Sequence, residues 1–383
     1  MQIQSKLPRV GTTVFTVMSH LAVQHGAVNL GQGFPDFAPP QRLRDALTNA
    51  MQAGHNQYAP MSGVPALREQ IARKVQSLYG RDVDAESEVT ITSGATEAIF
   101  AAIAAVVRHR DEVIVLDPCY DSYEPAIELS GGRAVHVPLM DESFAVDWQR
   151  VNAALTPRTR MIIVNTPHNP SGAVFDSADL DALAELTRDT NICVLSDEVY
   201  EHIVFDGRAH QSLSRHAELA ARSFIVSSFG KTYHCTGWKI GYCIAPRELT
   251  REFRKVHQYL TFSSFTPAQY ALSELLEHEP HHHAELPAFY EAKRDEFCAL
   301  LTDSRLRLLP VAGAYFQLAD YSAIARDKSD MEFCDWLVRE KGVAAIPLSV
   351  FYQHPPAQQR LIRFCFAKNS DTLRRGAERL CSL

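Results

Sequence analysis

Short apolar runs alternate with longer helical stretches over most of this chain. Seven of the runs are rich in the aliphatic and β-branched residues typical of strands, and they cover residues 88–92, 112–116, 134–137, 160–165, 191–196, 224–228 and 240–244. Strands that are almost continuously apolar, and that are separated by helices, belong to a sheet buried on both faces. The sequence therefore predicts an α/β fold with a mostly parallel, seven-stranded sheet sandwiched between helices.

The pattern changes from about Pro280 onward. Long charged helical stretches there surround only a few strand-like runs, at residues 314–318, 343–346 and 360–366. A mixture of helices and strands without strict alternation is typical of an α+β unit. We therefore expect a second, smaller α+β domain in the C-terminal part of the chain.

Composition excludes several classes of protein. The net charge is −7, so the chain lacks the basic surface that nucleic-acid binding requires. The longest apolar run, residues 98–107, is far below the ~18 residues that a membrane span needs, and no secretory signal stands at the start. The 8 cysteines form no Cys-x-x-Cys pair, which favours reduced thiols and a cytoplasmic location. The run His281–His283 has no further ligand-like spacing, so no metal site is expected.

The segment from Ser227 to Lys239 carries the strongest chemical signal. Its Gly230-Lys231-Thr232 resembles the end of a P-loop, but Ile225 stands where a P-loop requires glycine. Lys231 follows an apolar strand and is flanked by glycine and small polar residues. Partial desolvation at such a place makes a lysine amine nucleophilic, although a plain exposed lysine is the alternative reading.

Together with other segments, this one resembles the class I aminotransferases, which are pyridoxal-phosphate enzymes of fold type I. The resemblance covers nearly the whole chain, and within the family it is strongest to bacterial methionine aminotransferases and to kynurenine/glutamine aminotransferases. The matching segments are residues 31–37, 56–58, 93–98, 165–172, 196–200, 256–262 and 347–351, with Arg363. The resemblance implies pyridoxal 5'-phosphate as cofactor. It also implies residues 1–39 as an N-terminal arm and part of the small domain, 40–280 as the large cofactor-binding domain and 281–383 as the small C-terminal domain.

The resemblance assigns catalytic roles to three residues. Lys231 would bind the cofactor aldehyde covalently and then move the substrate proton, for which its pKa must fall below the ordinary ~10.4. Asp197 would pair with the cofactor's pyridinium nitrogen, although a helix N-cap is the alternative. Tyr200 and Asn169 would donate to the phenolic oxygen of the cofactor, and Tyr120 would stack on its ring. An Asn-Pro turn and a plain core aromatic are the alternatives for the last two.

Further residues are implied for the cofactor's phosphate. A strand followed by Ser-Gly-Ala-Thr and a helix offers free backbone N–H groups at Ala95 and Thr96, although an ordinary helix start explains the motif equally well. Ser228 and Lys239 would add a hydroxyl and a cation. Tyr58 would reach the phosphate from a partner subunit, which implies a homodimer with shared active sites.

The substrate site is implied by Arg363, whose guanidinium would grip the α-carboxylate, although a solvent-facing strand position is the alternative. Asn165 would support that grip, and Gly33 and Phe34 would form part of the pocket wall, with Phe15, Phe265 and Phe351 as further candidates. We predict transfer of the amino group from a neutral, bulky L-amino acid (methionine, an aromatic residue or kynurenine) to a 2-oxo acid by a ping-pong mechanism. The alternative is a C–S β-lyase.

Overall fold

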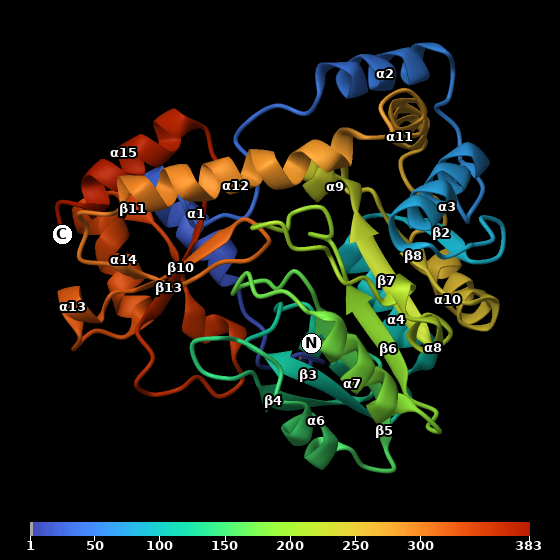
Figure 1. Ribbon diagram of the computed structural model, residues 1–383, viewed down its shortest axis with the longest axis horizontal. Helices are drawn as coiled ribbons and strands as arrows, with labels where there is room; N and C mark the ends of the chain where they lie inside the picture. Colours follow the sequence, from blue (N-terminus) through green and yellow to red (C-terminus); the bar gives the residue numbers. More distant parts are fainter. Residues whose placement is uncertain (1–2) are drawn as a thin grey trace.

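The central sheet contains the seven expected strands. The computed structural model describes residues 3–383, and Figure 1 shows the sheet at the centre of its larger part. The spatial order is β2-β8-β7-β6-β5-β3-β4, and β8 alone runs antiparallel to its neighbours. The prediction of a mostly parallel, seven-stranded sheet is therefore confirmed, with strands β2 (Val89–Thr92), β3 (Glu112–Asp117), β4 (Arg133–Pro138), β5 (Thr159–Asn165), β6 (Cys193–Asp197), β7 (Ser223–Ser228) and β8 (Gly241–Ile244).

Both faces of the sheet are buried under helices. Along β5, Ile162 and Val164 join one apolar cluster, whereas Met161 and Ile163 join the cluster on the opposite face. This alternation explains why the strands are mostly apolar rather than alternately apolar and polar. The second cluster lies under α4 (Ala95–Val106), α5 (Tyr123–Leu129) and α10 (Arg247–Leu260), and the first lies under α3 (Pro65–Tyr79), α6 (Trp148–Ala154), α7 (Ser177–Thr187) and α8 (Ala217–Ala220).

Two local features place the helix starts. Asp176 caps α7 in a reciprocal capping box with Asp179, which satisfies backbone N–H groups at the helix start. The start of α4 follows β2 directly through Gly94, whose φ of 81° lies in the left-handed region that favours glycine. The tight connection brings the first turn of α4 to the edge where the parallel strands end.

Helix α5 starts later than the sequence indicates. The run from Tyr120 to Ser130 reads as helical, but Tyr120–Ser122 form a turn in which Tyr123 N donates to Tyr120 O. The turn leaves Tyr120 beside the ends of the central strands rather than on a helix face.

The strands outside the central sheet form two smaller sheets. An antiparallel sheet has the order β12-β13-β10-β9, and a parallel pair joins β1 to β11. The strands are β1 (Val28–Asn29), β9 (Arg307–Leu308), β10 (Phe316–Asp320), β11 (Val343–Ala344), β12 (Ile346–Pro347) and β13 (Leu361–Cys365). The surrounding helices are α1 (Val14–Gln24), α12 (His282–Leu300), α13 (Ser322–Ala325), α14 (Asp330–Lys341) and α15 (Ser370–Leu380).

The remaining elements connect these parts. Helices α2 (Gln41–Gln52) and α11 (Thr266–His278) pack on each other at the edge of the larger part (Figure 1). Short helical turns are α9 (Phe229–Thr232), η1 (Leu213–Arg215), η2 (Thr236–Trp238) and η3 (Leu348–Phe351). No helix within residues 3–383 is long and apolar enough to cross a bilayer. The division of the chain after residues 39 and 280 stays a prediction.

Candidate active site

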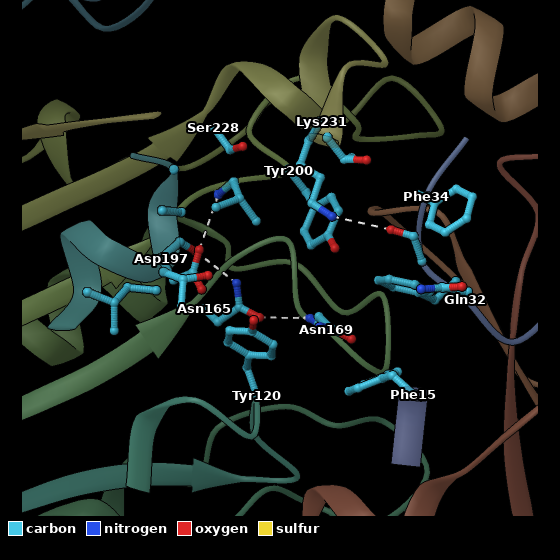
Figure 2. Close-up of a pocket in the computed structure, with 18 of the residues that line it drawn as sticks. Phe15, Gln32, Phe34, Tyr120, Asn165, Asn169, Asp197, Tyr200, Ser228 and Lys231 are labelled. Carbon is cyan, nitrogen blue, oxygen red and sulfur yellow. Dashed lines mark hydrogen bonds between the residues drawn. The ribbon is translucent and has the colours of Figure 1, made fainter. Parts of the chain in front are cut away.

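A cavity of about 270 Å³ lies where the central strands end and meet the C-terminal sheet. Figure 2 shows its side chains converging from both parts of the molecule. Every predicted site residue except Tyr58, Phe265 and Phe351 lines it. The full lining is Phe15, Gln32, Gly33, Phe34, Gly94, Ala95, Thr96, Ile99, Tyr120, Asn165, Asn169, Asp197, Val199, Tyr200, Ser228, Lys231, Thr236, Lys239, Phe316 and Arg363.

Lys231 lies on the short helix α9, directly after β7. Its Nζ donates to Gly33 O at 3.3 Å and lies 5.6 Å from the ring centroids of Tyr200 and Tyr315. Burial, together with the cations Lys239 and Arg363, lowers the pKa of Lys231 to about 8. The amine is therefore much more available as a base or nucleophile near neutral pH than an exposed lysine is.

Asp197 is the last residue of β6 and is 4% exposed. Its Oδ2 accepts a hydrogen bond from Tyr123 OH at 2.7 Å, and its Oδ1 accepts a weaker one from Val199 N at 3.4 Å. Burial raises the pKa of Asp197 to about 6 despite these bonds and the nearby Lys231 cation. A carboxylate held this way pairs well with a cationic ring nitrogen placed in the cavity, because such a partner offsets its desolvation.

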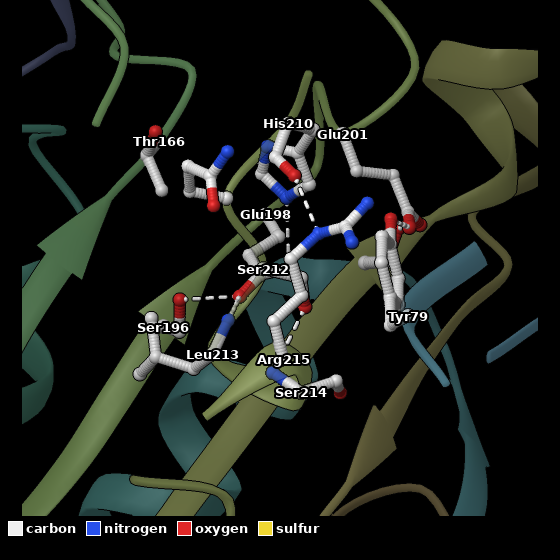
Figure 3. A network of polar contacts seen from close by, with 12 residues as sticks. Tyr79, Thr166, Ser196, Glu198, Glu201, His210, Ser212, Leu213, Ser214 and Arg215 are labelled. Carbon is white, nitrogen blue, oxygen red and sulfur yellow. Dashed lines mark hydrogen bonds and ion pairs between the residues drawn. The ribbon is translucent and has the colours of Figure 1, made fainter. Parts of the chain in front are cut away.

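A second buried carboxylate fixes the chain beside Asp197, as Figure 3 shows. Glu198 is 1% exposed, and its Oε1 accepts from Ser196 Oγ at 2.8 Å and from Leu213 N at 3.0 Å. Its Oε2 lies 3.0 Å from His210 Nε2. Because Ser196 and Glu198, the two neighbours of Asp197, are both hydrogen-bonded, these contacts fix the position of the end of β6.

The first turn of α4 and Lys239 present hydrogen-bond donors and a cation at the same place. No side chain caps the helix at Gly94, and within residues 3–383 the N–H groups of Ala95 and Thr96 have no protein acceptor. A Cβ built on Gly94 would lie 3.3 Å from Lys239 Nζ, so the ammonium sits over the helix start. Ser228 adds a hydroxyl to the same wall of the cavity. Free N–H groups, a cation and a hydroxyl together suit a phosphate group.

Arg363 lies on β13 and is almost completely buried. Its Nη1 donates to Asn169 Oδ1 at 2.6 Å and its Nη2 to Gly31 O at 3.2 Å, whereas its buried Nε has no partner within the described chain. The guanidinium carbon lies 4.0 Å from the ring centroid of Phe316. Burial lowers the pKa of Arg363 to about 10, so the side chain remains cationic at neutral pH and has donors left for a carboxylate.

The two asparagines of the site have different partners. Asn165 Nδ2 donates to Asp197 O at 2.8 Å, and its Oδ1 accepts from Asn169 N at 2.7 Å. Asn169, rather than Asn165, contacts Arg363 directly. Asn165 therefore links the end of β6 to the loop that carries Asn169.

Comparison with known proteins gives the family. Residues 26–380 match the family described as aminotransferase class I and II. The chain is 56% identical to the methionine aminotransferase of Escherichia coli strain K12 over 380 residues, covering 99% of this chain and 98% of that protein. This chain belongs to the class I and II aminotransferase family.

Other relatives and solved structures agree with this assignment. This aminotransferase is 33% identical to mouse kynurenine–oxoglutarate transaminase 1 over 414 residues, covering 100% of this chain and 98% of that protein. A crystal structure of YbdL from Escherichia coli, for which a methionine aminotransferase function was identified, superposes with a TM-score of 0.97 at 55% identity and covers both chains completely. The N-succinyldiaminopimelate aminotransferase structure from Mycobacterium tuberculosis gives a TM-score of 0.96 at 41% identity, again over 100% of both chains.

Three of the predicted residues of this aminotransferase do not line the cavity of the chain itself. Tyr58 is 81% exposed and does not line the cavity, and Phe265 is also exposed. Phe351 is buried 5.9 Å from the ring of Phe15 and likewise does not line the cavity.

Several lining residues escaped the sequence analysis. Their local conformation and register in the fold decide whether each one faces the cavity, and the sequence has no separate signal for them. They are Gln32, Gly94, Ile99, Val199, Thr236 and Phe316.

Proposed function

We propose that this aminotransferase binds pyridoxal 5'-phosphate at Lys231 and moves the amino group of a neutral, bulky L-amino acid, methionine above all, to a 2-oxo acid. One observation carries the proposal: the half-buried amine of Lys231, the buried carboxylate of Asp197 and the buried guanidinium of Arg363 surround a single cavity. Such a set gives separate places for an aldehyde, a ring nitrogen and a substrate carboxylate.

The described residues fit this cofactor. The N–H groups at Ala95 and Thr96, with Ser228 and Lys239, would hold the phosphate, while Asp197 would hold the ring nitrogen. Tyr120 and Val199 would flank the ring, and Tyr200 with Asn169 would donate to its phenolic oxygen. The bound cofactor supplies an electron sink for the pair of electrons left at the substrate's Cα.

The remaining steps belong to side chains of this chain. Arg363 binds the substrate's α-carboxylate, which fixes the orientation of Cα toward Lys231. Lys231 Nζ takes the proton from Cα, and its lowered pKa supplies the neutral amine for this step. Asp197 remains ionised opposite the ring nitrogen and keeps that nitrogen protonated.

The cavity walls favour an uncharged side chain. Phe15, Phe34 and Phe316 line the cavity and offer apolar and aromatic contacts, which suit a thioether or an aromatic ring. The relatives named for methionine and for kynurenine support the same choice.

A panel of amino donors tests the proposed function. Each donor is paired with several 2-oxo acids and the pairs are ranked by kcat/KM, and methionine and aromatic donors are expected to lead aspartate and glutamate. Release of pyruvate and ammonia from a cysteine conjugate without any 2-oxo acid would instead identify a C–S β-lyase. A ranking led by acidic donors would contradict the proposed substrate class.

We also propose a homodimer that completes each site. Tyr58 packs against Phe262 with ring centroids 5.3 Å apart. Tyr259, Leu260 and Phe265, which are close to Phe262 in the sequence, are also exposed. An exposed apolar group of this kind is typical of an interface between chains. A second copy would cover these side chains and receive the Tyr58 hydroxyl at its phosphate site.

Substitution Tyr58→Phe tests the shared site. Loss of one hydrogen bond to a charged group costs about 1.5–3 kcal/mol, so the Kd for the cofactor is expected to rise about tenfold or more. Equilibrium dialysis of the apoprotein measures the Kd, and sedimentation velocity measures the dimer. Tyr259→Phe, which changes another exposed tyrosine, is the matched control. An unchanged Kd in Tyr58→Phe would refute the shared site.

The lowered pKa of Lys231 predicts a pH profile for cofactor capture. Only the neutral amine attacks an aldehyde, so the capture rate rises with pH and reaches half of its limit near pH 8. An exposed lysine would give a midpoint near ~10.4. Stopped-flow absorbance of the apoprotein mixed with cofactor, from about pH 6 to about pH 10, measures the midpoint. A midpoint above about 9.5 would show that the amine is not desolvated.

Two broader expectations remain proposals. The proposed three-part division of the chain at residues 39/40 and 280/281 is supported by the pairing of β1 with β11, which joins the N-terminal segment to the C-terminal part. A cytoplasmic location is supported by the cysteines, all 8 of which are unpaired.

A further inference from the structure

Lys368 is a buried cation that has no carboxylate partner within the part of the chain that the structure describes. Lys368 is 3% exposed, and no Asp or Glu within residues 3–383 forms an ion pair with its ammonium group. Its Nζ donates to Phe34 O at 2.7 Å and to Gln32 O at 3.3 Å, and it lies 4.7 Å from the ring centroid of Phe34. All three contacts go to one short loop.

Burial of an ammonium group is costly unless its charge is compensated. Here two carbonyl oxygens and one aromatic face provide that compensation, and all three exist only when the loop from Gln32 to Phe34 has this conformation. Rearrangement of the loop would leave the buried cation without partners. The cation therefore stabilises this conformation more strongly than an apolar side chain of the same size would.

The segment that carries Lys368 holds the far end of the same loop as well. Asn369 N donates to Asp36 Oδ1 at 2.5 Å, and Thr372 Oγ1 donates to Asp36 Oδ2 at 2.7 Å. Lys368 itself follows β13 closely, so the strand that supplies Arg363 continues directly into the anchor of the loop.

The loop forms one wall of the active-site cavity. Gln32, Gly33 and Phe34 all line it, and Gly33 O accepts the hydrogen bond from Lys231 Nζ at 3.3 Å. A Cβ on Gly33 would lie 2.9 Å from the ring of Phe316, so the loop approaches that ring as closely as a glycine permits. Phe34 is 38% exposed, and Figure 2 shows its ring on the side of Lys231 that is turned away from Asp197.

We propose that Lys368 is a positioning residue that sets the preference for bulky side chains by holding Phe34 against the cavity, an inference that rests on the proposed function. Lys368 does not touch the substrate. It acts through the loop, so its effect depends on the size of the substrate's side chain and on the presence of the Phe34 ring.

A double-mutant cycle tests this coupling. Lys368→Met keeps the length and apolar stem of the side chain and removes its donors. In this variant the kcat/KM for methionine is expected to fall about tenfold, through a higher KM. The kcat/KM for alanine, whose methyl group is too short to reach Phe34, is expected to change less than about twofold. Phe34→Ala is expected to raise the KM for methionine similarly, and the double variant to resemble Phe34→Ala alone. Additive effects, or an equal loss for both donors, would overturn the proposal.

A measurement that does not depend on catalysis distinguishes this proposal from the proposed function. Amide hydrogen exchange of the apoprotein is expected to become at least about fivefold faster at residues 32–36 in Lys368→Met and to stay unchanged across β6 and β7. Arg222→Met is the matched control, because Arg222 also donates to backbone carbonyls, those of Thr187 and Ile192, away from the cavity. Unchanged exchange at residues 32–36 would refute the anchoring role even if the enzyme transaminates, and absence of transamination in the wild type would refute the proposed function alone.

Discussion

Replacement of Lys231 by alanine is expected to lower kcat for transamination by at least ~10³-fold. The substitution removes the only half-buried amine among the residues that line the cavity close to Asp197 and Tyr200, and with it the group that both captures the aldehyde and moves the proton. Treatment of the wild-type holoenzyme with borohydride should leave a cofactor adduct on the peptide that contains Lys231. The alanine variant should give no adduct when the same digest is analysed by mass spectrometry.

Two further variants make the result specific. Lys231→Arg keeps a cation at the position but cannot form the covalent link, so it should be as inactive as the alanine variant. Lys255→Ala removes an exposed lysine whose ion pair is with Glu252, and it should retain full activity. An adduct on any other lysine, or rapid transamination by Lys231→Ala, would show that the assignment of the amine is wrong.

Replacement of Arg363 by methionine is expected to lower kcat/KM for amino donors by ~10²-fold or more. A bidentate contact between guanidinium and carboxylate includes two charge-assisted hydrogen bonds of about 1.5–3 kcal/mol each. Two of the five N–H donors of Arg363 are used by Asn169 and Gly31, and the rest remain for the carboxylate. Methionine fits among the Phe15, Phe316 and Phe351 rings, so the apolar surroundings should be retained.

Comparison of substrates with and without a carboxylate distinguishes the loss of carboxylate binding from a general disruption of the active site. 3-(Methylthio)propylamine is methionine without its carboxylate, and it should react equally slowly with the wild type and with Arg363→Met. Cofactor affinity, measured by dialysis, should be unchanged within about twofold, because the phosphate and ring contacts lie on other elements. A fall in cofactor affinity as large as the fall in kcat/KM would indicate that Arg363 supports the cofactor rather than the substrate.

The central sheet could be predicted because its signal is local. The seven strands are mostly apolar, and most of them are followed within two residues by glycine, proline or a polar residue. The direction of β8 could not be predicted in this way, because a strand reads the same in either direction. The pairing of β1 with β11 was equally invisible, since two-residue strands have no periodicity and their partners lie far apart in the chain.

Some residues of the candidate site could likewise be predicted from the sequence, and others could not. Lys231, Asp197 and Ala95 follow strands or begin helices at the carboxyl edge of the sheet, so topology alone brings them together. Phe316 and Lys368 lie in C-terminal segments, and only the tertiary structure determines that one ring faces the cavity and that one ammonium holds its wall.

The pairing of Val28 with Val343 makes the assembly of the enzyme a late event in synthesis. An N-terminal segment that finds its strand partner only near the end of the chain must wait, unpaired, while the ribosome makes everything between them. Folding with such distant contacts is slow, and the waiting segment is open to chaperones or to mispairing. A messenger cut short before the codon for Val343 would therefore yield a chain that has the central sheet but lacks the strand that pairs with its N-terminal segment.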